Sequence, residues 1–79
     1  MKDFVERIIK EHKELRNKVN NLSNFVDNNF NSLNKEEYSL MRLQLNAMIN
    51  YLTYLEQRLK IYNIYITPNG EYLEKLNIK

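Results

Sequence analysis

Three side chains near the start of the 79-residue sequence have the types and spacing of an anion-binding surface: Phe4, Arg7 and Lys18. On a helix of about 3.6 residues per turn they project within about 60° of one another, beside the apolar stripe of that helix. Phe4 and Lys18 lie about four turns apart, or ~21 Å of rise. One small molecule could not bridge them within a subunit, whereas two such helices packed antiparallel would bring Phe4 of one subunit to Lys18 of another. Periodicity alone favours the plainer interpretation, a solvated charged flank.

Arg58 is the fourth candidate, because it interrupts an otherwise apolar and aromatic stripe on the second predicted helix. A guanidinium within a subunit contact requires an anion or a carboxylate partner to offset its desolvation. Two interpretations remain open. Arg58 binds an anionic ligand, or it forms a salt bridge to Glu56 or to Glu11 of a neighbouring subunit.

The sequence is poor in groups for catalysis or metal binding. It has one His, no Cys and a single Gly, so it lacks a glycine-rich phosphate loop and a Cys-containing metal site. His12 falls on the apolar stripe, where we expect a hydrogen-bonded core residue or one paired with a carboxylate. Glu11 and Glu14 are expected to pair with basic neighbours on the same helix, namely Arg7, Lys10 and Lys18. We therefore expect no enzymatic activity, no cofactor and no metal.

Two long helices must position the candidate residues. A 3-4 spacing of apolar side chains predicts one helix from about residue 4 to the Asp27–Asn29 cluster, with Asp3 as its N-cap. Asn34, followed by two glutamates, is the start signal of a second helix that extends to Tyr62. The two stripes consist of Val5, Ile8, His12, Leu15, Val19, Leu22 and Val26, and of Tyr38, Met41, Leu45, Met48, Leu52, Leu55, Leu59 and Tyr62.

The short link between these helices predicts the fold class, which is all-α: an antiparallel hairpin of two long helices. Phe30 and Leu33 are expected to close its core at the turn. Residues 1–62 would form this oligomerisation and ligand-binding domain. Residues 63–79 would form a C-terminal extension with a turn at Pro68–Gly70, folded as a small hairpin or a short helix.

The second helix has another apolar stripe on nearly its opposite side, which we call the second stripe. It consists of Leu40, Leu43, Ala47, Tyr51, Tyr54, Arg58 and Ile61. One partner helix cannot cover both sides, and an exposed patch of this size predicts self-association into a helical homo-oligomer. The alternative is that the C-terminal extension folds back over part of the second stripe.

Charge and hydropathy limit the partners. Twelve basic and ten acidic side chains give a net charge of +2, without the basic block that binding to long nucleic acids requires. No apolar run approaches the ~18 residues of a membrane span, and the first residues lack the apolar stretch of a signal peptide. With no Cys, the sequence predicts a cytoplasmic protein without a membrane partner.

An ordered set of residues between positions 4 and 60 is typical of one known family. The set comprises Phe4 to Glu11, Leu15, Lys18, Leu22, Phe25, Val26, Phe30, Leu33, Glu36, Glu37, Gln44, Leu45, Met48, Tyr51, Leu55, Arg58 and Leu59. In this order and spacing the sequence resembles the small phage proteins of the anti-CBASS cyclic-oligonucleotide sponge family. The resemblance excludes the C-terminal extension.

The resemblance implies a compact helical homohexamer that sequesters the cyclic nucleotide signals of bacterial antiphage defence (CBASS) in the host cytoplasm. It implies cyclic dinucleotides such as cyclic GMP-AMP bound between subunits, with Phe4 on the bases and Lys18 on the phosphate. The aromatic residue of the family is commonly a tyrosine, so Phe4 keeps the stacking surface and lacks a hydroxyl. It also implies separate sites for cyclic trinucleotides near the oligomer axis, at Arg58. The alternative is a helical interaction module that binds a host or phage protein.

Overall fold

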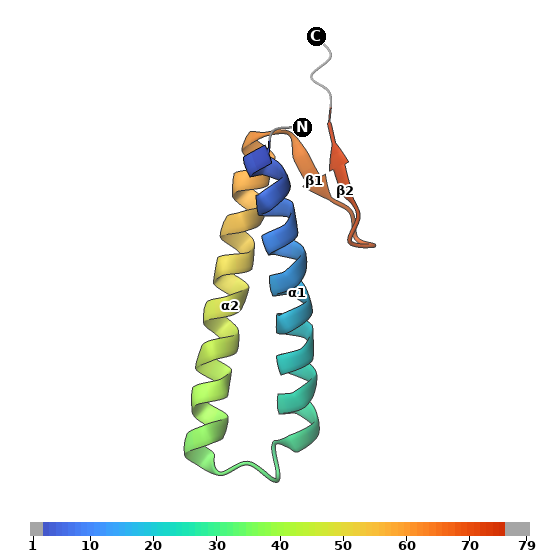
Figure 1. The fold of residues 1–79 in the computed structure, drawn as a ribbon. Coiled ribbons are helices and arrows are strands. Elements are labelled where there is room, and N and C mark those ends of the chain that lie inside the picture. The colour runs from blue at the N-terminus through green and yellow to red at the C-terminus, as the bar shows by residue number, and fades with distance from the viewer. Residues whose placement is uncertain (1–2, 76–79) are drawn as a thin grey trace.

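The computed structural model describes residues 3–75, which form a long helical hairpin followed by a short strand pair (Figure 1). Helix α1 spans Asp3–Asn29 and helix α2 spans Lys35–Ile61, and the two run antiparallel. Strands β1, Ile64–Ile66, and β2, Tyr72–Glu74, form a two-stranded antiparallel sheet. The predicted helical hairpin is confirmed. Residues 1–2 and 76–79, the outer limits of the two predicted segments, lie outside the described residues.

The helix ends are set by polar side chains. The side chain of Asn34 caps α2, because its Oδ1 accepts a hydrogen bond of 2.7 Å from the backbone N–H of Glu37. Helix α1 ends at Asn29, within the predicted cluster, and the Asn29 side chain donates to the carbonyl of Phe25. The prediction that Asp3 is the N-cap of α1 is wrong, because Asp3 already belongs to the helix. It lies in the first turn, where its carboxylate suits the positive end of the helix dipole.

The seam, the interface between α1 and α2, contains the residues that the two main stripes predicted. Its buried side chains are Val5, Ile8, His12, Val19 and Val26 of α1 and Leu45, Leu55 and Leu59 of α2. Two expectations at the ends are wrong. Tyr62 is partly exposed because it caps α2 beyond the last helical turn, and Phe30 is exposed at the loop end. There Phe30 lines a shallow depression of about 270 Å³ with Leu33, Lys35 and Tyr38.

A tight turn at residues 67–70 connects the two strands. The backbone N–H of Gly70 donates to the carbonyl of Thr67, with Pro68 and Asn69 between them, and Gly70 has φ of 86°. Pro and Asn suit the central positions of such a turn, and Gly adopts positive φ without a steric penalty. Ile66 pairs with Tyr72 across the sheet.

Three elements meet at the open end of the hairpin, where α1 begins and α2 ends. Ile64 of β1 joins Val5 and Ile8 of α1 and Leu55 and Leu59 of α2 in one buried cluster. Ile66 and Tyr72 pack against this cluster from the strand pair. The core is therefore thickest at the open end, because a third element adds apolar surface there that two helices alone do not provide.

The strand pair covers one flank of α1 rather than the second stripe of α2. Ile9 packs against the core cluster, and the guanidinium of Arg16 lies against Gly70, so closely that a Cβ at that glycine would displace the Arg16 side chain. Every residue of the second stripe is exposed. The alternative in which the extension covers that stripe is therefore wrong for the described residues.

None of the described helices has an apolar stretch long enough to span a bilayer.

Candidate ligand-binding site

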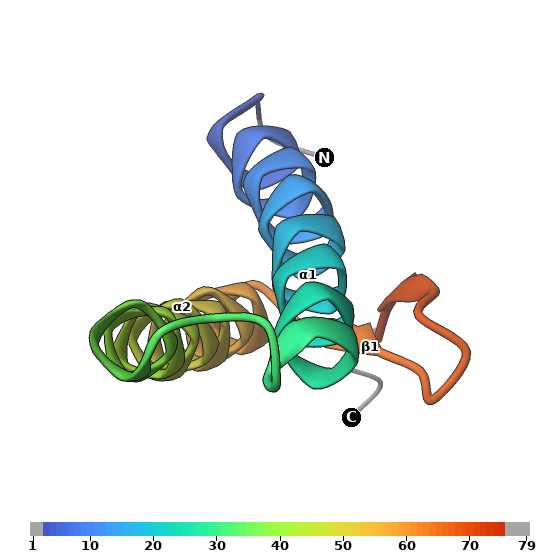
Figure 2. The same ribbon diagram turned by 90° about the horizontal axis from the view of Figure 1, so that it is seen from below.

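The flank of α1 that contains Phe4, Arg7 and Lys18 faces away from the strand pair. Arg16, whose guanidinium lies against Gly70 in the turn between the strands, and Lys18 are two residues or about 200° apart on the helix, and so lie on nearly opposite sides of α1. Figure 2 shows α2 on one side of α1 and the strand pair on the other. All three flank residues are exposed. The described part of the C-terminal extension, residues 63–75, thus leaves the candidate surface open.

Phe4 contacts the aromatic residue that caps the other helix, Tyr62. Its ring lies 5.0 Å from the ring of Tyr62 at an interplanar angle of 77°, an edge-to-face arrangement. Phe4 is 39% exposed and Tyr62 is 37% exposed, so each ring keeps accessible surface beside the contact. The pair belongs to the open end, where α1 begins and α2 ends, and gives that end an aromatic surface drawn from both helices.

Two arginines lie next to this aromatic pair along the helices. Arg7 is three residues from Phe4 on α1, and Arg58 is four residues from Tyr62 on α2, spacings that make side chains neighbours on a helix surface. Both are exposed. Within residues 3–75 neither forms an ion pair, and the carboxylate of Glu56 is instead bonded to a histidine. Arg58 is therefore available to an external anion or to a carboxylate of another subunit.

Lys18 is separate from this group. It lies ~21 Å along α1 from Phe4 and is exposed, and its side chain makes no hydrogen bond or ion pair with any other residue between 3 and 75. The predicted pairs of Glu11 and Glu14 with basic neighbours on α1 are not formed either. Three of the four candidate residues are thus near the open end, and the fourth is in the middle of the hairpin on the same flank.

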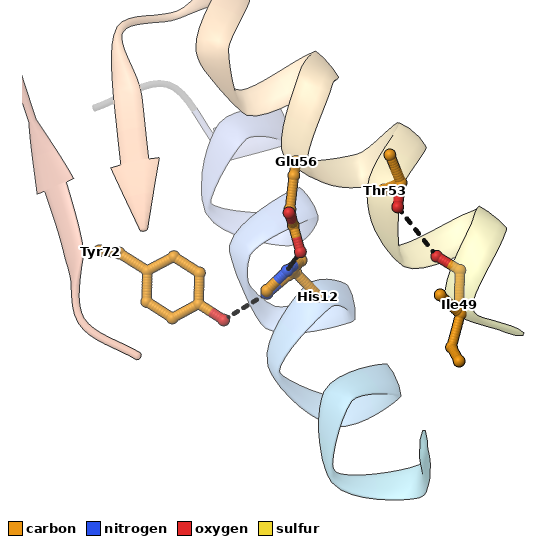
Figure 3. Close-up of polar contacts among 5 residues, drawn as sticks. All are labelled: His12, Ile49, Thr53, Glu56 and Tyr72. Atoms are coloured by element: carbon orange, nitrogen blue, oxygen red, sulfur yellow. Dashed lines mark hydrogen bonds and ion pairs between the residues drawn. The ribbon is translucent and has the colours of Figure 1, made fainter. Parts of the chain in front are cut away.

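His12 is bound in the seam by a chain of hydrogen bonds that joins three elements (Figure 3). It is 1% exposed. Its Nε2 lies 2.9 Å from the carboxylate of Glu56 on α2, and its Nδ1 lies 2.7 Å from the hydroxyl of Tyr72 on β2. A carboxylate only accepts, so Nε2 carries the hydrogen, and in the neutral ring Nδ1 accepts from the Tyr72 hydroxyl. The prediction of a hydrogen-bonded core histidine is confirmed.

Tyr72 is held against α1 by more than this bond. Its ring meets the His12 ring edge-on at 5.5 Å, and the Lys13 ammonium lies 5.6 Å from its centroid. Burial raises the pKa of the Tyr72 phenol, with a smaller contribution of the same sign from Glu56 and an opposing one from Arg16. The fold therefore favours the neutral phenol, which is the form that donates to His12.

The raised pKa gives a prediction for alkaline titration. Because the folded pKa lies above the unfolded value of about 10, the stabilisation is complete below pH 10 and is lost as the pH rises through the folded pKa. We expect the absorbance difference at 295 nm between wild type and Tyr72→Phe to have its midpoint above pH 10. A midpoint at or below pH 10 would contradict the buried hydrogen-bonded phenol.

The fold and the exposed flank define a class: a small helical hairpin with aromatic and basic side chains exposed on one flank of its first helix. The sequence model of a family described as Sequestin matches residues 2–61, so the chain belongs to the Sequestin family. This confirms the resemblance to the anti-CBASS sponge family and indicates a sequestering role. No curated protein and no solved structure matches the chain. The matched segment ends at the last residue of α2, before the strand pair.

Sequence reasoning missed two residues of this region. Tyr62 was assigned to the core stripe because it continues the 3-4 spacing, yet the helix ends at Ile61 and Asn63 turns the chain away with φ of 63°. The Tyr62-Asn63 pair is the signal, since Asn tolerates positive φ after a helix. Nothing in the local pattern around Tyr72 points to His12, which is 60 residues away.

Proposed function

We propose that the protein is a non-enzymatic sponge that binds cyclic dinucleotides such as cyclic GMP-AMP between its subunits and withholds them from the effectors of CBASS defence. The proposal rests on its membership of the Sequestin family and on one observation above all. Phe4 and Lys18 are exposed on the same flank of α1 but lie ~21 Å apart, so a single small ligand can use both only across a subunit contact.

The chemistry of a cyclic dinucleotide suits such a contact. The ligand is a dianion with two bases, and an antiparallel pair of α1 flanks brings an aromatic ring of one subunit and an ammonium group of the other together at each end of the contact. Stacking of a base on an aromatic ring contributes ~1 to 3 kcal/mol, and a charge-assisted hydrogen bond to phosphate contributes about 1.5 to 3 kcal/mol. Phe4 stacks on a base, and Lys18 of the neighbouring subunit binds a phosphate. Arg7, one turn from Phe4, adds positive charge.

Arg58 is the residue that we assign to a second kind of ligand, distinct from the cyclic dinucleotides. It is exposed on the second stripe and has no ion-pair partner among residues 3–75. In an oligomer formed through this stripe, several copies of the guanidinium would face one another across the contact and require an anion. We assign Arg58 to the binding of cyclic trinucleotides such as cyclic triadenylate near the oligomer axis.

Assembly is the remaining part of the proposal. The second stripe exposes Leu40, Leu43, Tyr51, Tyr54 and Ile61, more apolar surface than a soluble monomer ordinarily leaves open. A homohexamer that packs these stripes together would bury them. In the cytoplasm of an infected host, several sites per particle would allow the protein to act by stoichiometry.

The stripe gives a prediction about assembly. The double substitution Leu43→Glu and Tyr54→Glu introduces two carboxylates into the proposed contact, so we expect light scattering to report a monomer in place of an oligomer. Leu73→Glu is the matched control, since Leu73 is equally apolar and exposed on β2, outside the stripe. An unchanged mass for the double variant would exclude the second stripe as the assembly surface.

Calorimetry tests the proposed function. Purified protein is titrated with cyclic GMP-AMP, cyclic di-AMP and cyclic triadenylate, and the ligand is then recovered and analysed for cleavage. We expect a dissociation constant near nanomolar, about −12 kcal/mol, for at least one cyclic dinucleotide, and an intact ligand. Binding weaker than about micromolar to all three, or a cleaved product, would overturn the sponge.

The exposed second stripe also favours a second candidate, a helical module that coats a host or phage protein. In that case the stripe is the docking surface for the partner rather than for other copies of the chain. Light scattering separates the two, because the module predicts a monodisperse monomer and the sponge predicts an oligomer.

A further inference from the structure

We propose that Tyr62 is a positioning residue of the ligand site: its ring fixes the orientation in which Phe4 meets a base. This rests on the proposed function, in which Phe4 is the stacking platform. The geometry points to Tyr62 because the two rings meet at 5.0 Å and 77°. A ring packed edge-to-face on a partly exposed phenylalanine restricts the rotamers that the phenylalanine can adopt.

The backbone of Tyr62 is itself held in place. Its N–H lies at the α2 C-cap and donates to the carbonyl of Leu59 at 3.0 Å, and the N–H of the next residue, Asn63, donates to the carbonyl of Lys60 at 3.0 Å. The Asn63 carbonyl accepts a 2.7 Å bond from the N–H of Lys75 beyond β2. The strand pair therefore secures the residue next to Tyr62 without touching the flank where the ligand binds.

The exposure of the pair fits a positioning role rather than a core role. Tyr62 is 37% exposed, in contrast to Leu55 and Leu59 on the same stripe, which are fully buried. A ring that served only to fill the core would be expected inside the cluster at the open end. Instead it stands at the surface, edge-on to Phe4, where it leaves Phe4 39% exposed and able to receive a planar ligand.

The test compares three variants with wild type by calorimetry with cyclic GMP-AMP and cyclic di-AMP: Tyr62→Leu, Tyr62→Phe and the matched control Tyr65→Leu. Tyr65 is 38% exposed, also an aromatic near the open end, but it lies on β1 and contacts Lys75. We expect Tyr62→Leu to weaken binding about 3- to 10-fold, the range that one edge-to-face contact represents. Tyr62→Phe keeps the ring and should bind within twofold of wild type, as should Tyr65→Leu.

A double-variant measurement separates positioning from general stability. If Tyr62 acts through Phe4, then adding Tyr62→Leu to Phe4→Leu should cause no further loss of affinity, whereas a purely structural defect would weaken binding in both backgrounds. Wild-type affinity in Tyr62→Leu, an equal loss in Tyr62→Phe, or full additivity in the double variant would each overturn the inference and leave the sponge intact. Absence of binding by wild type would instead overturn the proposed function, and this inference with it.

Discussion

Lys18→Glu is expected to abolish cyclic dinucleotide binding while leaving the fold and the oligomer unchanged. The ammonium is exposed on α1 and has no ion-pair partner within residues 3–75, so its replacement breaks no internal contact. At each site the substitution removes a charge-assisted bond of about 1.5 to 3 kcal/mol, and it places a carboxylate near a dianion. We expect affinity to fall by more than about 100-fold, measured by calorimetry.

The matched control for this substitution is Lys35→Glu. It makes the same change in net charge at an exposed lysine, but at the loop end of the hairpin, in the first turn of α2 where a carboxylate is favourable. Its affinity should stay within about twofold of wild type. If Lys18→Glu binds as wild type does, or if the two variants lose affinity equally, then Lys18 is not the phosphate contact.

Leu55→Ala is expected to have the largest effect on stability. Leu55 is 0% exposed and lies in the cluster where α1, α2 and β1 meet. Removing a buried leucine side chain costs about 2 to 5 kcal/mol, depending on how far the cavity can collapse. Because small domains are stable by only ~5 to 15 kcal/mol, this loss should shift the urea unfolding midpoint strongly downwards. The comparison must be made at one protein concentration, since assembly stabilises the folded subunit.

Leu73→Ala provides the control for that measurement. The same substitution on the outward face of β2 removes an exposed side chain, and we expect a change within about 0.5 kcal/mol. A small effect of Leu55→Ala, comparable with that of Leu73→Ala, would contradict the three-element core at the open end.

The helical hairpin could be predicted from the sequence because its signals are local. The 3-4 spacing determines which side of each helix is buried, and an Asn at position 34 can satisfy an orphan N–H of α2 whatever the rest of the chain does. The same periodicity shows that α2 has two apolar sides. Arg7, Lys18 and Arg58 could be placed on exposed sides for the same reason.

The contacts of the strand pair could not be predicted, because they join residues far apart in the chain. Tyr72 reaches His12 across 60 positions and Gly70 packs on Arg16 of α1, and neither pairing has a local pattern. Pro68 and Gly70 predict a turn but not the surface on which it docks. The Phe4–Tyr62 contact depends on where α2 ends and how far α1 extends beside it.

The division of the chain into a ligand-binding domain of residues 1–62 and an extension of residues 63–79 remains a prediction. Ile64 of β1 is part of the same buried cluster as both helices. Tyr72 of β2 is bonded to a seam residue. The described part of the extension is therefore packed as part of the subunit, on the side of α1 that the ligand would not occupy.

The central claim is that each ligand site takes Phe4 from one subunit and Lys18 from its neighbour. The direct measurement is calorimetry of mixed oligomers, produced by coexpression of Phe4→Leu and Lys18→Glu subunits and verified by native mass spectrometry. A contact between two different subunits retains one intact combination of Phe4 and Lys18, so the mixture should bind cyclic dinucleotide more tightly than either variant alone. If verified mixed oligomers bind no better than the two separate variants combined, the site is not shared between subunits and the account is wrong.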